Sequence, residues 1–176
     1  MSQYMNLIGH NARKASLEKI NTKLKNKILK KYASLLDKER NSIIIENTKD
    51  IKFALKKGLK NNLIDRLTIN NKKLDDIKAS INKIIKLKDP VNITLEKWNR
   101  PNGLKIKRVS IPIGVIGVIY ESRPNVTSDV ASLCFKSGNA VILKGGSEAI
   151  NTNKILAKLF RKALKENKVN KNFIQF

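Results

Sequence analysis

The sequence predicts an α/β protein made of N-terminal helices, a β-hairpin and the start of an open parallel sheet. Three observations support this prediction. Apolar residues recur at helical spacing up to residue 90. A turn-forming cluster then separates two strand-like runs, and from residue 112 short apolar runs alternate with helical segments. The chain therefore divides into a helical segment (1–90), a hairpin (91–111) and the first part of an α/β domain (112–176).

Helical periodicity dominates residues 1–90, where four successive apolar faces can be traced. Gly58 is suited to end the third helix. The fourth ends at Asp89, because the residue before a proline is pushed out of the helical region. The four faces comprise Leu7, Ile8, Ala12, Ala15 and Leu17; Leu24, Ile28, Leu29, Tyr32, Leu35 and Leu36; Ile43, Ile44, Ile51, Ala54 and Leu55; and Leu74, Ile77, Ile81, Ile84 and Ile85.

Strands are predicted after Pro90. Residues 92–98 and 104–110 flank the turn-forming run Asn-Arg-Pro-Asn-Gly and predict a hairpin. The near-continuous apolar run 114–120 predicts a strand buried on both faces of a parallel sheet. Two further strands are expected at 140–143 and 173–176. The helices between them run from a cap at Thr127 to about Lys136, and from a turn at 145–148 onward.

The composition limits the possible partners and compartments. A net charge of +23 and a pI near 10.2 are typical of proteins that bind nucleic acid or anionic membranes. Lysines, however, occur in every segment and aromatic residues make up only 5%, which favours solvated helix faces and leaves a polyanion site as the alternative. No apolar run reaches the ~20 residues of a membrane span, and no secretory signal opens the chain. We therefore expect a soluble, cytoplasmic protein without nucleic-acid or membrane partners.

Cysteine and histidine each occur once, as Cys134 and His10. These counts exclude an internal disulfide, a histidine-based metal site and a Ser-His-Asp triad, so no metal is expected. Cys134 lies between Leu133 and Phe135 on the apolar face of a predicted helix. A thiol in such a place behaves as a small hydrophobe with a raised pKa. We interpret Cys134 as a core residue rather than a nucleophile.

The turn at residues 144–148, Lys-Gly-Gly-Ser-Glu, follows a predicted strand and precedes a helix. Gly145 and Gly146 would let a ligand approach the backbone, and the helix would offer free N–H groups. Ser147 is suited to cap that helix. Lys144 stands at the carboxyl end of the strand, where ligands bind in open parallel sheets. The alternative is an ordinary strand-to-helix turn that happens to carry a lysine.

A second polar turn covers residues 120–127, Tyr-Glu-Ser-Arg-Pro-Asn-Val-Thr, at the carboxyl end of another predicted strand. Charged residues are costly there unless they are paired or face a cleft. Arg123 can bind phosphate or carboxylate through two N–H groups, and the Asn125 amide can stabilise an oxyanion. Alternatively, Arg123 pairs with Glu121 or Asp129, and Asn125 only shapes the turn. Two such turns at neighbouring strand ends favour a binding function.

The run 112–127, Pro-Ile-Gly-Val-Ile-Gly-Val-Ile-Tyr-Glu-Ser-Arg-Pro-Asn-Val-Thr, together with 129–134 and 137–146, resembles the γ-glutamyl phosphate reductase (glutamate-5-semialdehyde dehydrogenase) family. Residues 54–59 and 63–67 also resemble it. This resemblance implies the aldehyde dehydrogenase superfamily. The sheet would then begin a Rossmann-like, NADP-binding domain on which the helices pack, and the hairpin would serve oligomerisation.

The resemblance also implies roles for individual residues. Lys144, Gly145, Gly146 and Ser147 would lie along the adenosine ribose and 2′-phosphate of NADPH, and Tyr120 and Glu121 near the nicotinamide. Ser122, Arg123 and Asn125 would bind the substrate, γ-glutamyl phosphate. At residues 166–172, Glu-Asn-Lys-Val-Asn-Lys-Asn, the sequence departs from the Gly-Leu-Pro-like loop usual in the family.

The reaction implied by the family starts with attack of a thiolate on γ-glutamyl phosphate, which expels phosphate and leaves a thioester. Hydride transfer from NADPH then gives a thiohemiacetal, whose collapse frees the thiol and releases glutamate 5-semialdehyde for proline biosynthesis. The catalytic cysteine is expected beyond Phe176, so this chain would be an N-terminal fragment that lacks the catalytic domain and is inactive alone. A homo-oligomer and coupling to glutamate 5-kinase are further expectations. The alternatives are an inactive truncated product or a basic nucleic-acid-binding protein with an enzyme-like fold.

Overall fold

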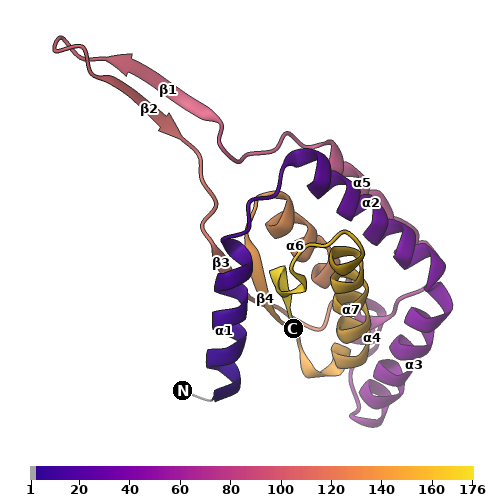
Figure 1. Ribbon diagram of the computed structural model, residues 1–176. Helices are drawn as coiled ribbons and strands as arrows, with labels where there is room; N and C mark the ends of the chain where they lie inside the picture. Colours follow the sequence, from indigo (N-terminus) through magenta and orange to yellow (C-terminus); the bar gives the residue numbers. More distant parts are fainter. Residues whose placement is uncertain (1–2) are drawn as a thin grey trace.

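The computed structural model describes residues 3–176, and five helices make up its first half (Figure 1). They are α1 (Gln3–Ser16), α2 (Thr22–Lys38), α3 (Arg40–Lys56), α4 (Asn61–Leu67) and α5 (Asn71–Lys86). The side chains of Asn21 and Asn70 cap α2 and α5 by accepting hydrogen bonds from the backbone at Leu24 and Lys73. The periodicity does not predict α4, which has seven residues and buries only Leu67 completely.

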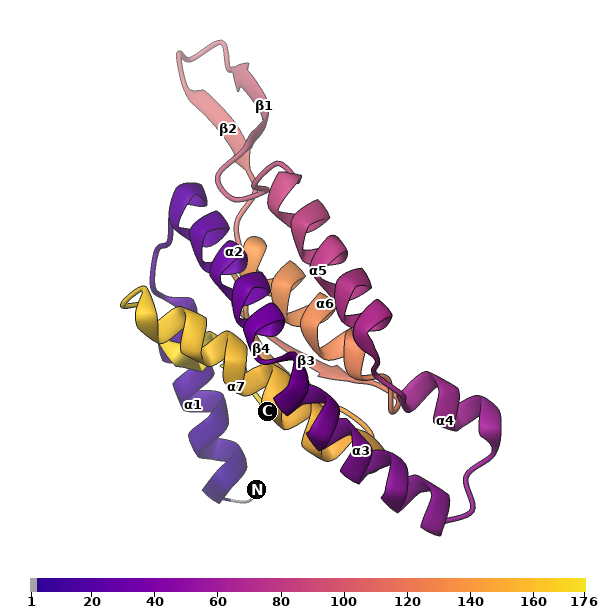
Figure 2. The same cartoon turned by 90° about the vertical axis from the view of Figure 1, so that its right-hand side faces the viewer.

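The predicted hairpin is confirmed as strands β1 (Thr94–Asn99) and β2 (Lys105–Val109), which pair antiparallel. Gly103 closes the turn with a φ of +83°, a left-handed conformation that suits glycine. Every residue of β1 is exposed. Figures 1 and 2 show the hairpin projecting from the body of the molecule as an isolated two-stranded ribbon.

The second half forms a parallel sheet in the order β3–β4–β5, as the alternating pattern predicts. Its strands are β3 (Val115–Ile119), β4 (Ala140–Lys144) and β5 (Ile174–Gln175). Helix α6 (Pro124–Lys136) joins the first two, and α7 (Ile150–Glu166) leads towards the third between short 3₁₀ turns, η1 (Ser147–Ala149) and η2 (Lys171–Phe173).

Two local predictions in this half are wrong. The central strand is β4, whereas β3 lies at the edge of the described sheet, so its Ile119 is 87% exposed instead of buried. Thr127 is not a cap either. Helix α6 begins at Pro124 with Arg123 in the capping position, because proline fits the first helical turn, and Thr127 lies buried inside the helix.

The helices cover the sheet in layers. Helix α1 packs against the sheet on one face, α6 and α7 lie on the other, and α2, α3 and α5 pack on α6 and α7 (Figures 1 and 2). Aromatic rings join these layers. Tyr32 and Phe160 lie 4.5 Å apart between ring centroids, and Phe135 contacts both Phe160 and Phe173 edge-on. The Tyr32 hydroxyl also shares a buried hydrogen bond of 2.6 Å with Ser128.

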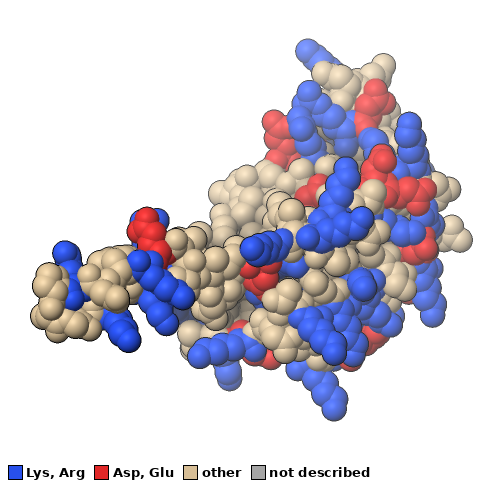
Figure 3. Space-filling view, turned by 90° about the horizontal axis from the view of Figure 1, so that it is seen from above, with Lys and Arg blue, Asp and Glu red and all other residues tan. Residues whose placement is uncertain are grey.

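On the face of the molecule drawn in Figure 3, basic side chains are spread out rather than collected in one stripe. Figure 3 shows lysine and arginine on both the hairpin and the body, with acidic side chains among them. Several form ion pairs, such as Lys31 with Glu166 and Lys78 with Asp37, each at 2.8 Å. Within residues 3–176, no helix has the length and apolarity to cross a membrane, and no cluster of acidic, cysteine or histidine side chains is arranged to hold a metal.

Candidate functional site

The turns that follow β3 and β4 lie directly against each other at the carboxyl edge of the sheet. A Cβ on Gly146 would collide with the Ser122 hydroxyl and come within 3.0 Å of the Ser122 backbone nitrogen. A Cβ on Gly145 would collide with the Asn153 amide and come within 3.0 Å of the Tyr120 ring. Only glycine, which has no Cβ, permits the two turns to approach this closely. The space beside both glycines is therefore filled by the chain's own side chains.

Glu148 holds the two turns together. Its carboxylate accepts hydrogen bonds from the Ser122 hydroxyl at 2.8 Å and the Ser147 hydroxyl at 2.9 Å, and Lys57, which directly follows α3, lies at 3.5 Å. Its own backbone N–H, these two hydroxyls and the Lys57 ammonium lower the pKa of Glu148 from 4.5 to about 2. Glu148 is thus a fixed negative charge at the edge of the site.

The amino end of α7 is capped from another helix. Ser147 is not its cap, because a 3₁₀ turn intervenes and the Ser147 hydroxyl donates to Glu148 instead. Asp50 of α3, which is only 1% exposed, accepts from the backbone N–H of Asn151 at 3.1 Å and of Thr152 at 2.8 Å. The free N–H groups expected at this helix end are therefore occupied by a carboxylate.

The side chain of Tyr120 is held in the same region by hydrogen bonds within the protein. Its hydroxyl shares a hydrogen bond of 2.7 Å with Thr127, which in turn donates to Asn153 at 2.8 Å. Burial raises the pKa of the Tyr120 hydroxyl. The hydroxyl is engaged within the protein, so a ligand at this edge would meet the ring rather than the phenol oxygen.

A cavity of about 410 Å³ opens beside the joined turns. Glu121, Ser122 and Arg123 line it together with Arg66 of α4. The carboxylate of Glu121 contacts Arg123 at 3.3 Å and Arg66 at 3.8 Å. Of the two partners expected for Arg123, the structure shows Glu121. Arg66 is a charged group that the sequence does not single out, since nothing in its local pattern distinguishes it from the other exposed cations.

Five of the nine predicted site residues do not line this cavity: Tyr120, Gly145 and Ser147 belong to the joined turns beside it, whereas Asn125 and Lys144 lie apart from it. Asn125 lines a separate hollow with Ser80 and Asp129, between α5 and α6. Lys144 is exposed at the end of β4, in register with Ile119, and its side chain forms no ion pair within residues 3–176. The structure thus brings together Tyr120, Ser122, Gly145 and Gly146, with Glu121 and Arg123 on the same edge.

Cys134 is a core residue, as the sequence predicts. It is 8% exposed on α6, and burial raises the pKa of its thiol. A buried thiol of this kind is a poor nucleophile at neutral pH.

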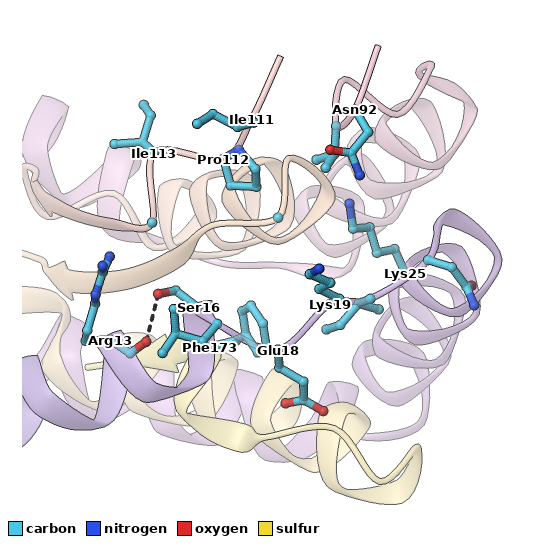
Figure 4. Close-up of a pocket in the computed structure, with 16 residues that line it drawn as sticks. Arg13, Ser16, Glu18, Lys19, Lys25, Asn92, Ile111, Pro112, Ile113 and Phe173 are labelled. Atoms are coloured by element: carbon cyan, nitrogen blue, oxygen red, sulfur yellow. Dashed lines mark hydrogen bonds between the residues drawn. The ribbon is translucent and has the colours of Figure 1, made fainter. Parts of the chain in front are cut away.

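A larger hollow of about 620 Å³ lies at the opposite, amino edge of the sheet (Figure 4). Arg13 and Ser16 of α1 face Ile111, Pro112 and Ile113 across it, and the Ser16 hydroxyl donates to the Arg13 carbonyl at 2.8 Å. None of the predicted site residues lines it. Ligands of open parallel sheets bind at the carboxyl ends of strands, so we place the site at the joined turns.

Comparison with known proteins identifies relatives of this chain. Over 160 residues it is 44% identical to a γ-glutamyl phosphate reductase from Thermodesulfovibrio yellowstonii and 46% identical to one from Aquifex aeolicus. These alignments cover 91% of this chain but only 38% and 37% of the relatives. The chain therefore spans well under half the length of the curated relatives it matches. No protein-family model matches it.

Solved structures agree with the sequence comparison. γ-Glutamyl phosphate reductase from Thermotoga maritima superimposes with a TM-score of 0.93 at 42% identity, covering 96% of this chain and 41% of that one. The Saccharomyces cerevisiae enzyme gives 0.90 at 34% identity, covering 99% and 46%. A putative aldehyde dehydrogenase from Bacillus subtilis shares the fold, with a TM-score of 0.67 at 18% identity over 98% of this chain and 35% of that one. By sequence and by fold, this chain is thus similar to part of the γ-glutamyl phosphate reductases, and its fold is shared with aldehyde dehydrogenases.

Proposed function

We propose that this chain supplies the cofactor contacts and part of the substrate contacts of an enzyme that reduces γ-glutamyl phosphate to glutamate 5-semialdehyde and phosphate with NADPH, in proline biosynthesis. The observation that carries the proposal is the pair of joined polar turns after β3 and β4, on a chain 44% identical to γ-glutamyl phosphate reductases. The carboxyl edge of a parallel sheet is where such ligands bind.

The cofactor contacts are assigned to Lys144 and the turn that follows it. The exposed Lys144 ammonium has no acidic partner within residues 3–176, and an unpaired ammonium suits the 2′-phosphate of NADPH. Gly145, Gly146 and Ser147 would lie along the adenosine ribose, and residues 120–121 would lie near the nicotinamide. NADPH, when bound, supplies the hydride. The protein's part is to orient it on a turn held in place by Glu148.

The substrate contacts are assigned to Ser122, Arg123 and Asn125. Arg123 and Ser122 border one cavity, whereas Asn125 lies in the next, so Arg123 is the stronger candidate for the acyl phosphate. The nucleophilic thiol is not Cys134, because that thiol is buried on the core side of α6. We therefore expect no reductase turnover from this chain alone.

The remaining assignments concern assembly and compartment. The exposed hairpin is the proposed oligomerisation element, and residues 112–176 are the proposed first part of the NADP-binding domain, with residues 1–90 packed on it. A cytoplasmic homo-oligomer that is functionally coupled to glutamate 5-kinase agrees with the proposed reaction.

A fluorescence titration of the chain with NADPH and NADH tests the cofactor assignment. NADPH should bind more tightly, and Lys144→Ala should remove most of the difference, because the 2′-phosphate is all that distinguishes the two ligands. Lys97→Ala on the exposed hairpin is the matched control, since it removes the same charge far from the turns. Equal binding of the two nucleotides by the unaltered chain would refute the assignment of Lys144.

A further inference from the structure

Two guanidinium groups share one carboxylate oxygen at the edge of the 410 Å³ cavity. Oε2 of Glu121 lies 3.3 Å from Nε of Arg123 and 3.8 Å from Nη1 of Arg66. The two arginines come from different parts of the fold, α4 and the turn before α6. They are separated by 57 positions in the sequence, from 66 to 123, and both contact the carboxylate of Glu121.

Glu121 can leave this position at little cost. Its side chain is 72% exposed, and those of Arg66 and Arg123 are 49% and 44% exposed. Exposed ion pairs contribute about 0.2–1 kcal/mol each, so rotation of Glu121 into solvent is a small change. The backbone of Glu121 would stay in place, because its carbonyl accepts a hydrogen bond from the N–H of Arg123 at 2.7 Å.

The cavity would then favour an anion. Glu148 also borders it, but Lys57 and two hydroxyl groups already hold that carboxylate. Helix α6, 13 residues long, starts directly after Arg123 without a side-chain cap, so its positive end lies close to the backbone of that arginine. With Glu121 turned outward, both arginines are free for a doubly charged group, which guanidinium binds through paired N–H donors.

We propose that Arg66 and Arg123 together bind the phosphate group of a phosphorylated ligand, and that Glu121 takes the place of that phosphate when the ligand is absent. The choice of candidate ligands rests on the proposed function, whereas the anion site itself does not. The phosphate can belong to an acyl phosphate or to the 2′-position of a nucleotide. Arg66 is then a binding residue, and Glu121 a competitor that the ligand must displace.

Calorimetric titration of the 176-residue chain with acetyl phosphate and with 2′-AMP tests this proposal, in about 0.15 M salt so that the weak attraction of scattered lysines is screened. Arg66→Gln should weaken phosphate binding about fivefold, and Glu121→Gln should strengthen it by a similar factor. Arg108→Gln is the matched control, because Arg108 forms another exposed pair, with Glu96 on the hairpin at 3.5 Å. This control should bind like the unaltered chain.

The opposite changes in phosphate affinity expected for Arg66→Gln and Glu121→Gln distinguish a binding role from a purely structural one. If the pair with Glu121 only held α4 in place, Arg66→Gln and Glu121→Gln would change phosphate binding in the same direction or not at all, and the proposal would fail. Equal losses in Arg66→Gln and Arg108→Gln would also overturn it. A larger loss of acetyl phosphate binding than of 2′-AMP binding in Arg66→Gln assigns the site to the substrate, and the reverse assigns it to the cofactor in place of Lys144. Equal binding of NADPH and NADH by the unaltered chain would refute the cofactor assignment of the proposed function but leave this binding result standing.

Discussion

The hydroxyl of Ser122 donates a hydrogen bond of 2.8 Å to Oε2 of Glu148 and so joins the turn after β3 to the turn after β4. The bond links residues 26 positions apart at the carboxyl edge of the sheet. Ser147 and Lys57 bind the other carboxylate oxygen. Because both turns carry proposed ligand contacts, their relative position should depend on this carboxylate and on the glycines that let the turns meet.

Replacement of Gly146 by alanine should destabilise the chain by about 1–3 kcal/mol, because the added methyl group would overlap the Ser122 side chain and press on its backbone nitrogen. Gly117→Ala in β3 is the matched control, since a Cβ there meets nothing within 4 Å. Urea unfolding followed by circular dichroism gives both free energies. Equal stability of the two variants would show that the turns do not need their close contact.

The carboxylate of Glu148 should make the free energy of unfolding depend on pH. Its pKa is lowered from 4.5 to about 2 in the folded chain, so its stabilising contribution is present above pH 4.5 and declines as the pH falls towards 2. Glu148→Gln should therefore flatten this part of the curve of unfolding free energy against pH. Glu96→Gln on the hairpin serves as the control and should keep the slope. An unchanged slope in Glu148→Gln would contradict the hydrogen-bonded carboxylate.

Asp50→Ala should cost about 3 kcal/mol, because it leaves the N–H groups of Asn151 and Thr152 at the start of α7 without an acceptor in a buried place. Hydrogen exchange measured by NMR should show faster exchange at these two amides in particular. Asp76→Ala, an exposed change on α5, should alter neither quantity. Full protection of both amides in Asp50→Ala would rule out the cap.

Tyr32→Phe should lower stability by about 1 kcal/mol, since it removes the buried hydrogen bond to Ser128 but keeps the ring against Phe160. Burial raises the pKa of Tyr32 above its ordinary 10.0, so its contribution is present below pH 10 and is lost as the pH rises further. The variant should thus lose less stability than the unaltered chain above pH 10. Tyr4→Phe, at an exposed position, is the control.

The order of elements could be predicted from the sequence, because it depends on local chemistry. Asn-Gly in a polar turn predicts the hairpin, and apolar spacing predicts α2, α3, α5 and α7. Burial could not be predicted in the same way. The run 115–119 is apolar throughout, yet its exposure depends on whether another strand lies beside it, and in the described sheet β4 occupies only one side.

The candidate site could be predicted only in part. Residues 120–123 and 144–148 stand out as polar turns after apolar strands, and the structure places them together. Arg66 and Asp50 could not be found, because each acts on a group far along the chain: Asp50 contacts Thr152 across 102 positions. The caps at Thr127 and Ser147 were predicted from residue type alone, whereas Pro124 and the 3₁₀ turn decide where the helices begin.

The packing of α2 and α3 on α7 has a consequence for biosynthesis. A ribosome releases the N-terminal helices first, but the surface that completes their core belongs to a helix made more than 90 positions after the end of α3, from 56 to 150. The apolar faces of α2 and α3 therefore stay exposed until α7 has emerged from the ribosome. Such distant contacts slow folding and leave intermediates open to association. We expect the newly made helical half to depend on chaperones until α7 has docked.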